Sequence, residues 1–459
     1  MTAVAADKKG VDKRLSIFWK NLWIVLAITL SSPVAVAAVA AAQDPLMGDQ
    51  WALSDPAAIG AQEAWTQSSG AGVLVAVLDT GVQLDHPDLA GNIWTNPGEI
   101  AGNGRDDDSN GIVDDVHGAN MFDRSANAGD DHGHGTHVAG IIAARQGNAI
   151  GGSGLAPAAK ILPVKVLDSS MSGTTDTLAA GIRYAVDRGA RILNVSLNSD
   201  TATEPMRAAV RYAGERGAII VASAGNNARN IDLLPSYPAS LSDPAILSVA
   251  AATDGGVLWN LSNSGLKSVD LAAPGQYIAS TMRGSSYQSR SGTSAAAPFV
   301  AASIALLAEA RPDLPMGALR DALLATTRRT DLLAALLGAG GRLDVGAAMH
   351  RVLAGRPWKS AAPHASAAAA GPTLLLRAKS KARVGSKLTL RWSATGADSV
   401  TTWRVSLNGK VVKTVSASKN AVTRRIARAG RHKWRVVGFD AGGAKVVAAR
   451  RAFQAVPRR

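Results

Sequence analysis

The stretch VLVAVLDTGV, residues 73–82, holds six apolar positions without a break and then places a carboxylate at Asp79. A short run that is apolar on both faces is typical of a strand in a parallel sheet that is covered on both sides. In such sheets, ligands bind beyond the carboxyl ends of the strands. A carboxylate beside a buried strand is costly unless it has a partner. The stretch therefore predicts an α/β fold with a functional acid at Asp79.

Further strands and helices alternate on either side of this stretch. Apolar runs that end in polar or glycine-rich sequence occupy residues 160–166, 191–196 and 218–223. Helical patterns separate them, over residues 175–188 and 203–216. Strands that alternate with helices indicate βαβ units. We therefore expect residues 50–353 to form one α/β domain of three layers with a mainly parallel sheet.

The remaining C-terminal sequence has a different pattern. Residues 354–372 are rich in alanine and proline and lack periodicity, which is typical of a linker. Alternating runs then follow, and Asn408-Gly409 between two of them favours a hairpin. Residues 373–459 are expected to form a small all-β sandwich of immunoglobulin-like or fibronectin-like architecture. Its expected strands are residues 387–393, 402–407, 410–415, 431–437 and 445–453.

The positive charge is confined to this C-terminal segment. Residues 371–459 hold 21 Lys and Arg and two acidic residues, a net charge of +19, while the other 370 residues carry −5. Such an asymmetry favours an anionic partner. We expect residues 373–459 to bind an anionic surface polymer, and we do not expect a nucleic acid partner for an exported chain. A purely solubilising role for the charge is the alternative.

The N-terminus indicates export. Basic residues precede the apolar run of residues 22–30, and a small-residue stretch ends at Ala42. This pattern predicts that residues 1–42 are a signal peptide and that the mature protein is secreted, periplasmic or at the cell surface. An uncleaved membrane anchor is the less favoured alternative, because residues 22–42 are just long enough to span a bilayer. The chain has no cysteine, which excludes disulfides, a thiol nucleophile and lipoprotein acylation.

Two further motifs contain polar residues that a core would not select. GHGTHVAG, residues 133–140, places His134 and His137 at the start of a helix. SGTSAAAPFV, residues 291–300, places Ser294 at the start of another. Each motif alone has an ordinary structural explanation, such as a turn, a helix cap or a packed histidine. The chain order Asp79, His134, Ser294 is that of one type of serine peptidase.

These motifs together resemble the subtilisin family of serine peptidases. Three other segments match it in the expected order: HPDL at 86–89, AGNN at 224–227 and GRLDVGAAM at 341–349. The resemblance covers about residues 50–353 and implies a serine endopeptidase. It implies that Ser294 is the nucleophile, His134 the general base and Asp79 its partner. Asn226 would donate to the oxyanion, and His137 would be structural.

The resemblance also assigns a substrate cleft. Ser196, Leu197 and Asn198 would form an edge strand that pairs with the substrate, which favours broad specificity. Ser223, Ala224 and Gly225 would form one wall of the primary specificity pocket. Asn198 stands where the family usually has glycine, so we expect a narrowed pocket or a reshaped edge. Ala295 stands where many members have methionine, so we also expect activity to tolerate peroxide.

A calcium ion is the expected cofactor, and no organic cofactor is expected. Asp106, Asp108 and Asn110 have calcium-loop spacing within GNGRDDDSNGIVDD, residues 102–115, and Asp114 would complete the set. A solvated acidic loop is the alternative. The resemblance implies a second calcium site that uses Asp88 and Asn148.

Two other functions stay open at this stage. Acyl-enzyme chemistry also serves peptide transferases and cyclases, and a surface-binding protein would depend mainly on the basic module. Only the peptidase explains the three motifs and Asn226 together. We therefore expect a monomeric enzyme that acts on proteins or peptides.

Overall fold

The chain forms two compact units, residues 1–360 and 361–459. The computed structural model describes residues 44–354, 373–377, 381–395, 400–408, 410–416, 418–439 and 445–457. The predicted signal peptide and the predicted linker, apart from Ala354, lie outside the described residues.

The first unit is built on a nine-stranded sheet with the order β10-β11-β7-β6-β5-β4-β1-β3-β2. Every neighbouring pair is parallel except β10 and β11. The strands are β1 (Leu74–Asp79), β2 (Ala119–Asn120), β3 (Lys160–Lys165), β4 (Ile192–Val195), β5 (Ile219–Ser223), β6 (Ile246–Ala252), β7 (Leu271–Pro274), β10 (Arg328–Arg329) and β11 (Gly341–Arg342). The mainly parallel sheet predicted from the sequence is thus confirmed.

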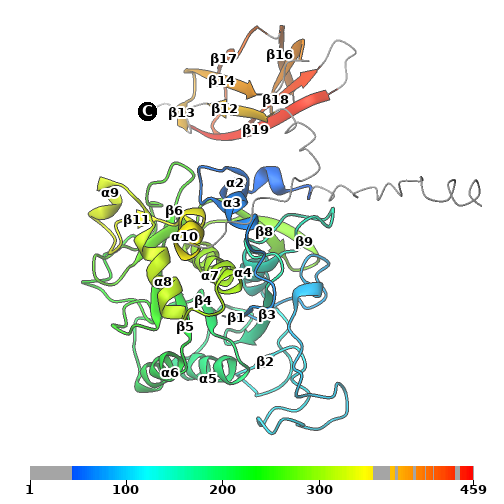
Figure 1. Ribbon diagram of the computed structural model, residues 1–459. Coiled ribbons are helices and arrows are strands. Elements are labelled where there is room, and N and C mark those ends of the chain that lie inside the picture. The colour runs from blue at the N-terminus through cyan, green and yellow to red at the C-terminus, as the bar shows by residue number, and fades with distance from the viewer. Residues whose placement is uncertain are drawn as a thin grey trace, which may run out of the picture. The chain divides into compact units, whose positions relative to one another are not determined.

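Helices cover both faces of this sheet and give the unit three layers (Figure 1). One face is covered by α2 (Trp51–Ser54), α3 (Ala61–Trp65), α4 (His134–Ala143), α7 (Thr293–Ala310), α8 (Met316–Ala325) and α10 (Val345–Val352). The opposite face is covered by α5 (Thr175–Asp187) and α6 (Glu204–Glu215). The short elements are η1 (Met47–Asp49), η2 (Ala90–Asn92), α9 (Asp331–Ala334) and the hairpin of β8 (Ile278–Met282) and β9 (Ser286–Arg290).

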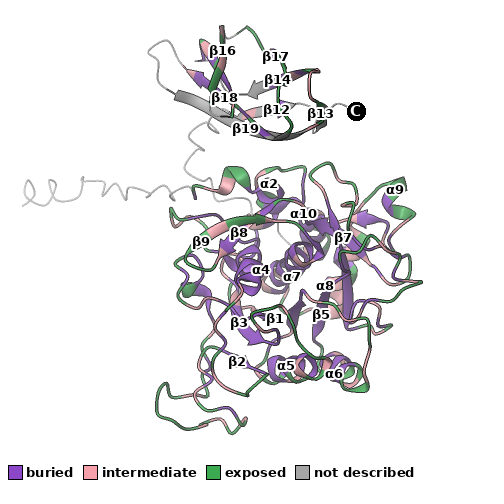
Figure 2. Cartoon of the chain, turned by 180° about the vertical axis from the view of Figure 1, so that it is seen from behind, coloured by how far each residue is buried: buried purple, intermediate pink, exposed green. Residues whose placement is uncertain are grey.

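The apolar run that opens β1 explains this layering. Val75 and Val77 pack in the cluster that contains α4 and α7, whereas Ala76 and Leu78 pack in the cluster that contains α5 and α6. All four side chains are completely buried, and Figure 2 shows that the central strands of the sheet are mostly buried. Successive strand residues point to opposite faces, so a strand between two helical layers needs apolar residues at every position.

The predicted strands and helices of this unit are confirmed within one or two residues at each end. Helix α6, for example, begins after Thr203, whose hydroxyl accepts the N–H of Met206 as an N-cap. The hairpin β8–β9 was not predicted, because residues such as Ser286 and Arg290 give its second strand a polar pattern. Among the described residues, α7 alone has the length and hydropathy of a membrane span, and 83% of that segment is buried in the core.

The second unit contains two small sheets, which confirms a small all-β module. One has the order β12-β14-β17 and the other the order β13-β19-β18-β15-β16. Both contribute to one core, with Trp392 from the first sheet and Trp403 from the second in edge-to-face contact. An immunoglobulin-like or fibronectin-like identity stays a prediction. The strands are β12 (Thr373–Arg377), β13 (Lys381–Arg383), β14 (Lys387–Thr395), β15 (Thr402–Leu407), β16 (Lys410–Ser416), β17 (Ala421–Arg425), β18 (Gly430–Phe439) and β19 (Lys445–Val456).

Three of these strands, β12, β13 and β17, were not predicted from the sequence. The predicted hairpin is present, since β15 and β16 pair antiparallel with Leu407 opposite Lys410. Asn408 has a positive φ of 50°, the backbone conformation that such a tight turn requires.

Candidate active site

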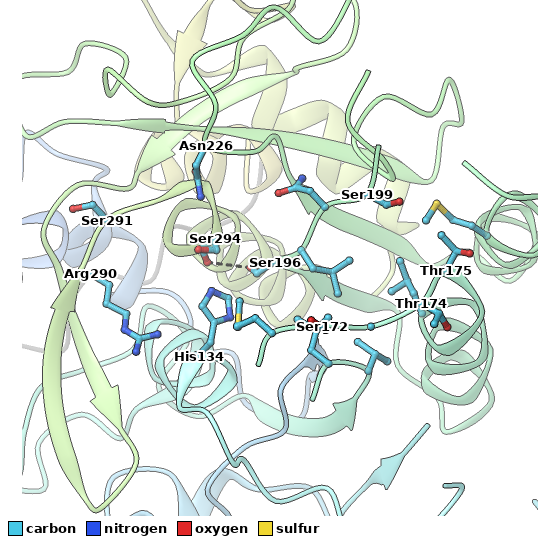
Figure 3. A pocket seen from close by; sticks show the side chains of 18 residues that line it. His134, Ser172, Thr174, Thr175, Ser196, Ser199, Asn226, Arg290, Ser291 and Ser294 are labelled. Atoms are coloured by element: carbon cyan, nitrogen blue, oxygen red, sulfur yellow. Dashed lines mark hydrogen bonds between the residues drawn. The ribbon is translucent and has the colours of Figure 1, made fainter. Parts of the chain in front are cut away.

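A cleft of about 670 Å³ opens beyond the carboxyl ends of the parallel strands. Segments that follow β3, β4 and β5 form its walls, and the first turns of α4 and α7 project side chains into it. Figure 3 shows His134, Ser294 and Asn226 around one point of this cleft. Residues from three motifs that lie far apart in the sequence therefore meet where an α/β sheet is expected to bind ligands.

Asp79 and His134 form a buried hydrogen-bonded pair. The distance from His134 Nδ1 to Asp79 Oδ1 is 2.7 Å, and the Asp79 side chain is 0% exposed. Asp79 Oδ1 also accepts the N–H of Thr80, while Oδ2 has no partner among the described residues. Burial acts to lower the pKa of His134, but the Asp79 carboxylate outweighs it and the pKa is raised above 6.5. The pair fixes the proton on Nδ1 and leaves Nε2 as the basic atom.

Asp130 holds the start of the helix that carries His134. Its Oδ1 accepts the N–H of Gly133 at 2.7 Å, and its Oδ2 accepts the N–H of Thr136 at 2.9 Å. The hydroxyl of Thr80 donates to the same carboxylate and accepts the N–H of Gly135. These bonds satisfy helix N–H groups that have no intrahelical acceptor. They tie the first turn of α4 to the residue that follows Asp79.

The close approach of α4 to β1 depends on Gly135. A methyl group at this position would lie 2.0 Å from the carbonyl oxygen of Gly81 and 3.1 Å from Cβ of Asp79. No side chain fits there without moving the helix away from the strand. The glycine after His134 therefore permits the short Asp79–His134 distance.

Ser294 is placed by a break in the hydrogen bonding of α7. Pro298 has no N–H, so the carbonyl of Ser294, four residues earlier, has no intrahelical donor. The hydroxyl of Ser196 donates to this carbonyl at 3.0 Å, and the amide of Asn194 donates to the Ser196 hydroxyl at 2.9 Å. The segment after β4 is thereby fixed to the turn that carries Ser294.

Thr293 orients the amide of Asn226. Asn226 Oδ1 accepts the N–H of Thr293 at 2.8 Å and its hydroxyl at 2.9 Å, so Nδ2 points toward the cleft. A methyl group built on Gly292 would lie 3.2 Å from both Asn226 Nδ2 and Ser294 Oγ. The amide donor and the hydroxyl oxygen therefore lie close to each other, as an oxyanion donor beside a nucleophile must.

His137, one turn along α4, lies in different surroundings. It is 2% exposed, and its Nε2 donates to the carbonyls of Ile278 and Gln288. Burial lowers the pKa of His137 to about 3, so its ring is neutral near neutral pH. A neutral ring bonded to the β8–β9 hairpin holds that hairpin against α4.

Asn198 closes the space between the two predicted substrate walls. Its Nδ2 donates to the carbonyl oxygen of Ser223 at 2.8 Å. Ser196, Leu197 and Asn198 line the cleft, whereas residues 223–225, which include Ala224, are buried and do not. The Ser223 hydroxyl is buried without a partner among the described residues. The bridge joins the segment after β4 to the end of β5.

The sequence pattern of the subtilase family, Peptidase S8, matches residues 70–340, which are more than half of the chain. The chain belongs to the subtilase family. By family it is a subtilisin-like serine protease.

Two curated proteins and one solved structure show how similar this subtilase is to known proteases. Thermitase from Thermoactinomyces vulgaris is 40% identical over 253 residues, which are 55% of this chain and 81% of thermitase. The cell wall-associated protease of Bacillus subtilis (strain 168) is 42% identical over 253 residues, but these are only 25% of that protein. Among solved structures, a protease of Pseudoalteromonas arctica PAMC 21717 has a TM-score of 0.58 at 28% identity, covering 68% of this chain and 100% of that one.

The acidic loop of this subtilase, defined as residues 99–115, gathers three carboxylates. Oxygen atoms of Glu99, Asp106 and Asp108 lie within 4.8 Å of one another. Glu99 was not predicted, and its Oε2 is buried without a partner among the described residues. Asp108 also forms an ion pair with Arg188. Three converging carboxylates, one with an unpaired oxygen, fit an oxygen-seeking cation such as calcium.

The other predicted ligands of the acidic loop have different partners. Asp114 accepts the N–H groups of Gly102 and Gly104, which directs both of its oxygens away from the three carboxylates. The Asn110 amide donates to Asp115, and its oxygen accepts the N–H of Ile112. A cation at Glu99, Asp106 and Asp108 would not use these two side chains as they lie.

The second predicted calcium site brings Asp88 and Asn148 together. Asn148 Nδ2 donates to Asp88 Oδ1 at 2.7 Å, and the hydroxyl of Tyr287 donates to Oδ2 at 3.2 Å. Burial raises the pKa of Asp88, and the nearby Asp44 carboxylate adds to this. Two carboxylates here fit a cation, although the Asn148 oxygen accepts the N–H of Ile150 instead of facing them.

Most of the residues that were not predicted from the sequence hold other residues of the site in place. Asp130, Thr293 and Glu99 each bind groups that are distant in the chain or depend on the exact loop path. Asp44 lies 44 residues before Asp88 in the sequence. One pattern was available: Asp130 stands four residues before a helix start whose N-cap residue, Gly133, has no side chain to cap it.

Proposed function

We propose that this subtilase is a secreted serine endopeptidase that hydrolyses proteins and peptides through Asp79, His134, Ser294 and Asn226. The observation that carries the proposal is the buried 2.7 Å pair of Asp79 and His134, which opens on the same cleft as Ser294 and Asn226. An acid, a base, a hydroxyl and an amide donor in one cleft are the parts that acyl transfer needs.

The chemistry follows from the placement of these atoms. His134 Nε2 takes the proton of Ser294 Oγ as Oγ attacks the peptide carbonyl. Asp79 accepts the hydrogen bond of Nδ1–H and stabilises the imidazolium. Asn226 Nδ2 and the free N–H of Ser294, in the first turn of α7, stabilise the oxyanion.

The tetrahedral intermediate then collapses to an acyl-enzyme, which water hydrolyses. His134 gives its proton to the leaving amine, and the carbon–nitrogen bond breaks. Water next loses a proton to His134 and attacks the ester, and His134 returns that proton to Ser294 Oγ as the ester bond breaks and the carboxylic acid product leaves. Donors that are fixed before the reaction need no reorganisation when charge develops.

The test is the activity of Ser294→Ala on casein. We expect a loss of at least about 10³-fold, because the nucleophile is removed while binding remains. Ser303→Ala is the matched control, since Ser303 lies on the same helix with its hydroxyl bonded to the Phe299 carbonyl in the core. Equal loss in both variants, or activity of Ser294→Ala equal to wild type, would contradict the proposal.

A transferase or cyclase would share the acyl-enzyme but end with an amine in place of water. Product analysis with a peptide substrate and a competing amine distinguishes the two. We expect mainly hydrolysis, because the cleft is open to water. A product in which the amine is incorporated at most turnovers would favour the transferase.

We also propose that the mature protein is exported after cleavage near Ala42, on the sequence pattern of residues 1–42. Mass measurement of the protein recovered outside the cell tests this. An intact N-terminus in the membrane fraction would indicate an anchor instead.

The basic module is proposed to bind an anionic surface polymer. Lys387 lies directly opposite Arg425 in the pairing of β14 with β17, and both side chains are exposed. Like charges in this position destabilise a sheet unless an anion offsets them. Retention on heparin should fall with salt, and it should fall further in Lys387→Gln/Arg425→Gln. Unchanged elution of that variant would contradict the proposal.

A further inference from the structure

The ionisable side chains that line the cleft can carry only positive charge. Of the eighteen described residues that line it, only His134 and Arg290 carry an ionisable side chain, and no carboxylate is among them. A cleft with a cation and no anion attracts negative ligands, because low-dielectric walls focus the field of the charge.

Arg290 is held at the cleft by its backbone and has no anionic partner. It is the last residue of β9 and pairs with Ile278 of β8. Its Nε donates to Gln288 Oε1 at 3.1 Å, and among the described residues no carboxylate oxygen lies within 4.0 Å to form an ion pair with it. A guanidinium presents a planar fork of donors that matches a carboxylate.

Nearby carboxylates form no ion pair with Arg290, because other groups bind their oxygens. Asp130 uses its two oxygens to bind Thr80, the N–H of Gly133 and the N–H and hydroxyl of Thr136. Asp79 binds His134. Both act on Arg290 only at longer range, and burial lowers the pKa of its half-buried guanidinium. A half-buried, unpaired cation gains most from an incoming anion.

The position of Arg290 identifies the part of the substrate that it meets. Figure 3 shows Arg290 and Ser291 on one side of Ser294, with Ser199 and Thr175 on the other. The segment 196–199 is the proposed wall for the acyl part of the substrate. The opposite side, flanked by His134, holds the part that leaves with the new amino group, since His134 protonates that group.

We propose that Arg290 binds a carboxylate in the leaving part of the substrate and makes this subtilase prefer an acidic group there. The inference rests on the proposed peptidase function. The carboxylate has two possible sources, an Asp or Glu side chain directly after the cleaved bond or the free C-terminus of a short leaving segment. A charge-assisted pair in a half-buried position favours the acidic substrate by roughly 10-fold to 100-fold in kcat/KM.

The test uses peptides that are identical before the cleaved bond and carry Asp, Asn, Glu or Gln directly after it. We expect wild type to prefer Asp over Asn and Glu over Gln by at least about tenfold. Arg290→Gln should remove this preference while it still cleaves the Asn and Gln peptides, and Arg290→Lys should restore part of it. A second pair of peptides, with the leaving residue as a free acid or a carboxamide, identifies terminal carboxylate binding.

Arg283→Gln is the matched control, because Arg283 lies in the turn of the same hairpin, is exposed, does not line the cleft and donates to the carbonyl of Asp131. It should keep the wild-type preference. Arg290 also acts to lower the pKa of His134, so the acid limb of the pH profile should move to higher pH in Arg290→Gln. The proposal is overturned if wild type shows no preference in either peptide set, or if Arg290→Gln keeps it. Failure of the peptidase function is separate, since it would abolish cleavage of all the peptides.

Discussion

Two groups of carboxylates in the first unit are stabilised in opposite ways. Asp79 is completely buried and is bound by His134 and the N–H of Thr80, both from the chain itself. In the acidic loop, Glu99, Asp106 and Asp108 face one another, and the Glu99 Oε2 has no partner among the described residues. In the first group, residues of the chain itself bind the carboxylate, and this arrangement suits a catalytic role. In the second group, backbone N–H groups and Arg188 bind Asp106 and Asp108 but leave the Glu99 oxygen unpaired, which fits a cation.

The largest effect that separates the two groups is expected for Asp79→Asn. The amide cannot hold the required tautomer of His134, so kcat/KM should fall by about 10⁴-fold, the size of the corresponding change in the trypsin-type triad. Asp106→Asn is the comparison, and it should leave kcat/KM on peptides nearly unchanged at ambient temperature. Kinetics on one peptide substrate measure both. Similar losses in the two variants would remove the distinction.

Chelation should affect the second group and spare the first. If calcium binds the acidic loop or the Asp88 site, EGTA removes about 2.7 kcal/mol of stability at free calcium a hundred times above Kd. For a unit of roughly 310 residues, at about 2.1 cal/mol/K of unfolding entropy per residue, that corresponds to a fall of about 4 °C in Tm. Calorimetry with and without EGTA measures it, and Asp106→Asn and Asp88→Asn show which site is responsible. No change in Tm of the wild type would remove both sites.

A smaller effect, on substrate preference, is expected from the hydrogen bond between the Asn198 side chain and the Ser223 carbonyl. Asn198→Gly removes the bridge to the Ser223 carbonyl and opens the pocket. We expect kcat/KM for a large apolar residue before the cleaved bond to rise about tenfold relative to alanine, in keeping with the gain from burying one or two methylene groups. Asn198→Ser keeps a small polar side chain, so its preference for the large apolar residue should lie between those of wild type and Asn198→Gly. A preference that does not change would show that the bridge does not limit the pocket.

The smallest expected effect concerns pH. The pKa of His134 is raised above 6.5, against burial, by the Asp79 carboxylate. His134 must be neutral to act as a base, so the acid limb of kcat/KM should lie above pH 6.5 and should move down in the residual activity of Asp79→Asn. Because the pKa of His134 is higher in the folded than in the unfolded protein, protonation of His134 stabilises the fold fully below pH 6.5. This stabilisation is lost as pH rises through the raised pKa of the folded protein. A limb at or below 6.5 in wild type would contradict the role of the pair.

Sequence reasoning succeeded where a local pattern carries the physics. The apolar run before Asp79 fixes a strand buried on both faces, and Thr203 before an amphipathic run fixes a helix start. It fell short where two distant segments have to meet. Nothing near Ser196 indicates that it binds the carbonyl freed by Pro298, nor does the sequence place Asp44 beside Asp88. Such contacts depend on loop paths, which local periodicity does not determine.

The metal candidates show the same limit within one loop. The spacing of Asp106 and Asp108 indicated that these carboxylates converge, and they do. It also suggested Asn110 and Asp114, but the oxygens of these two side chains bind N–H groups in other parts of the loop and Asp114 does not join the three carboxylates. Short polar side chains often bind their own backbone, and this competition is invisible in spacing alone.

The central claim is that Asp79 and His134 activate Ser294, and covalent labelling tests it most directly. The folded wild-type protein should react with a fluorophosphonate at one site, identified by mass as Ser294, with a rate that follows the deprotonation of His134. Asp79→Asn and His134→Ala should react far more slowly while keeping the wild-type circular dichroism spectrum. Labelling at another residue, or equal rates in wild type and His134→Ala, would contradict the account.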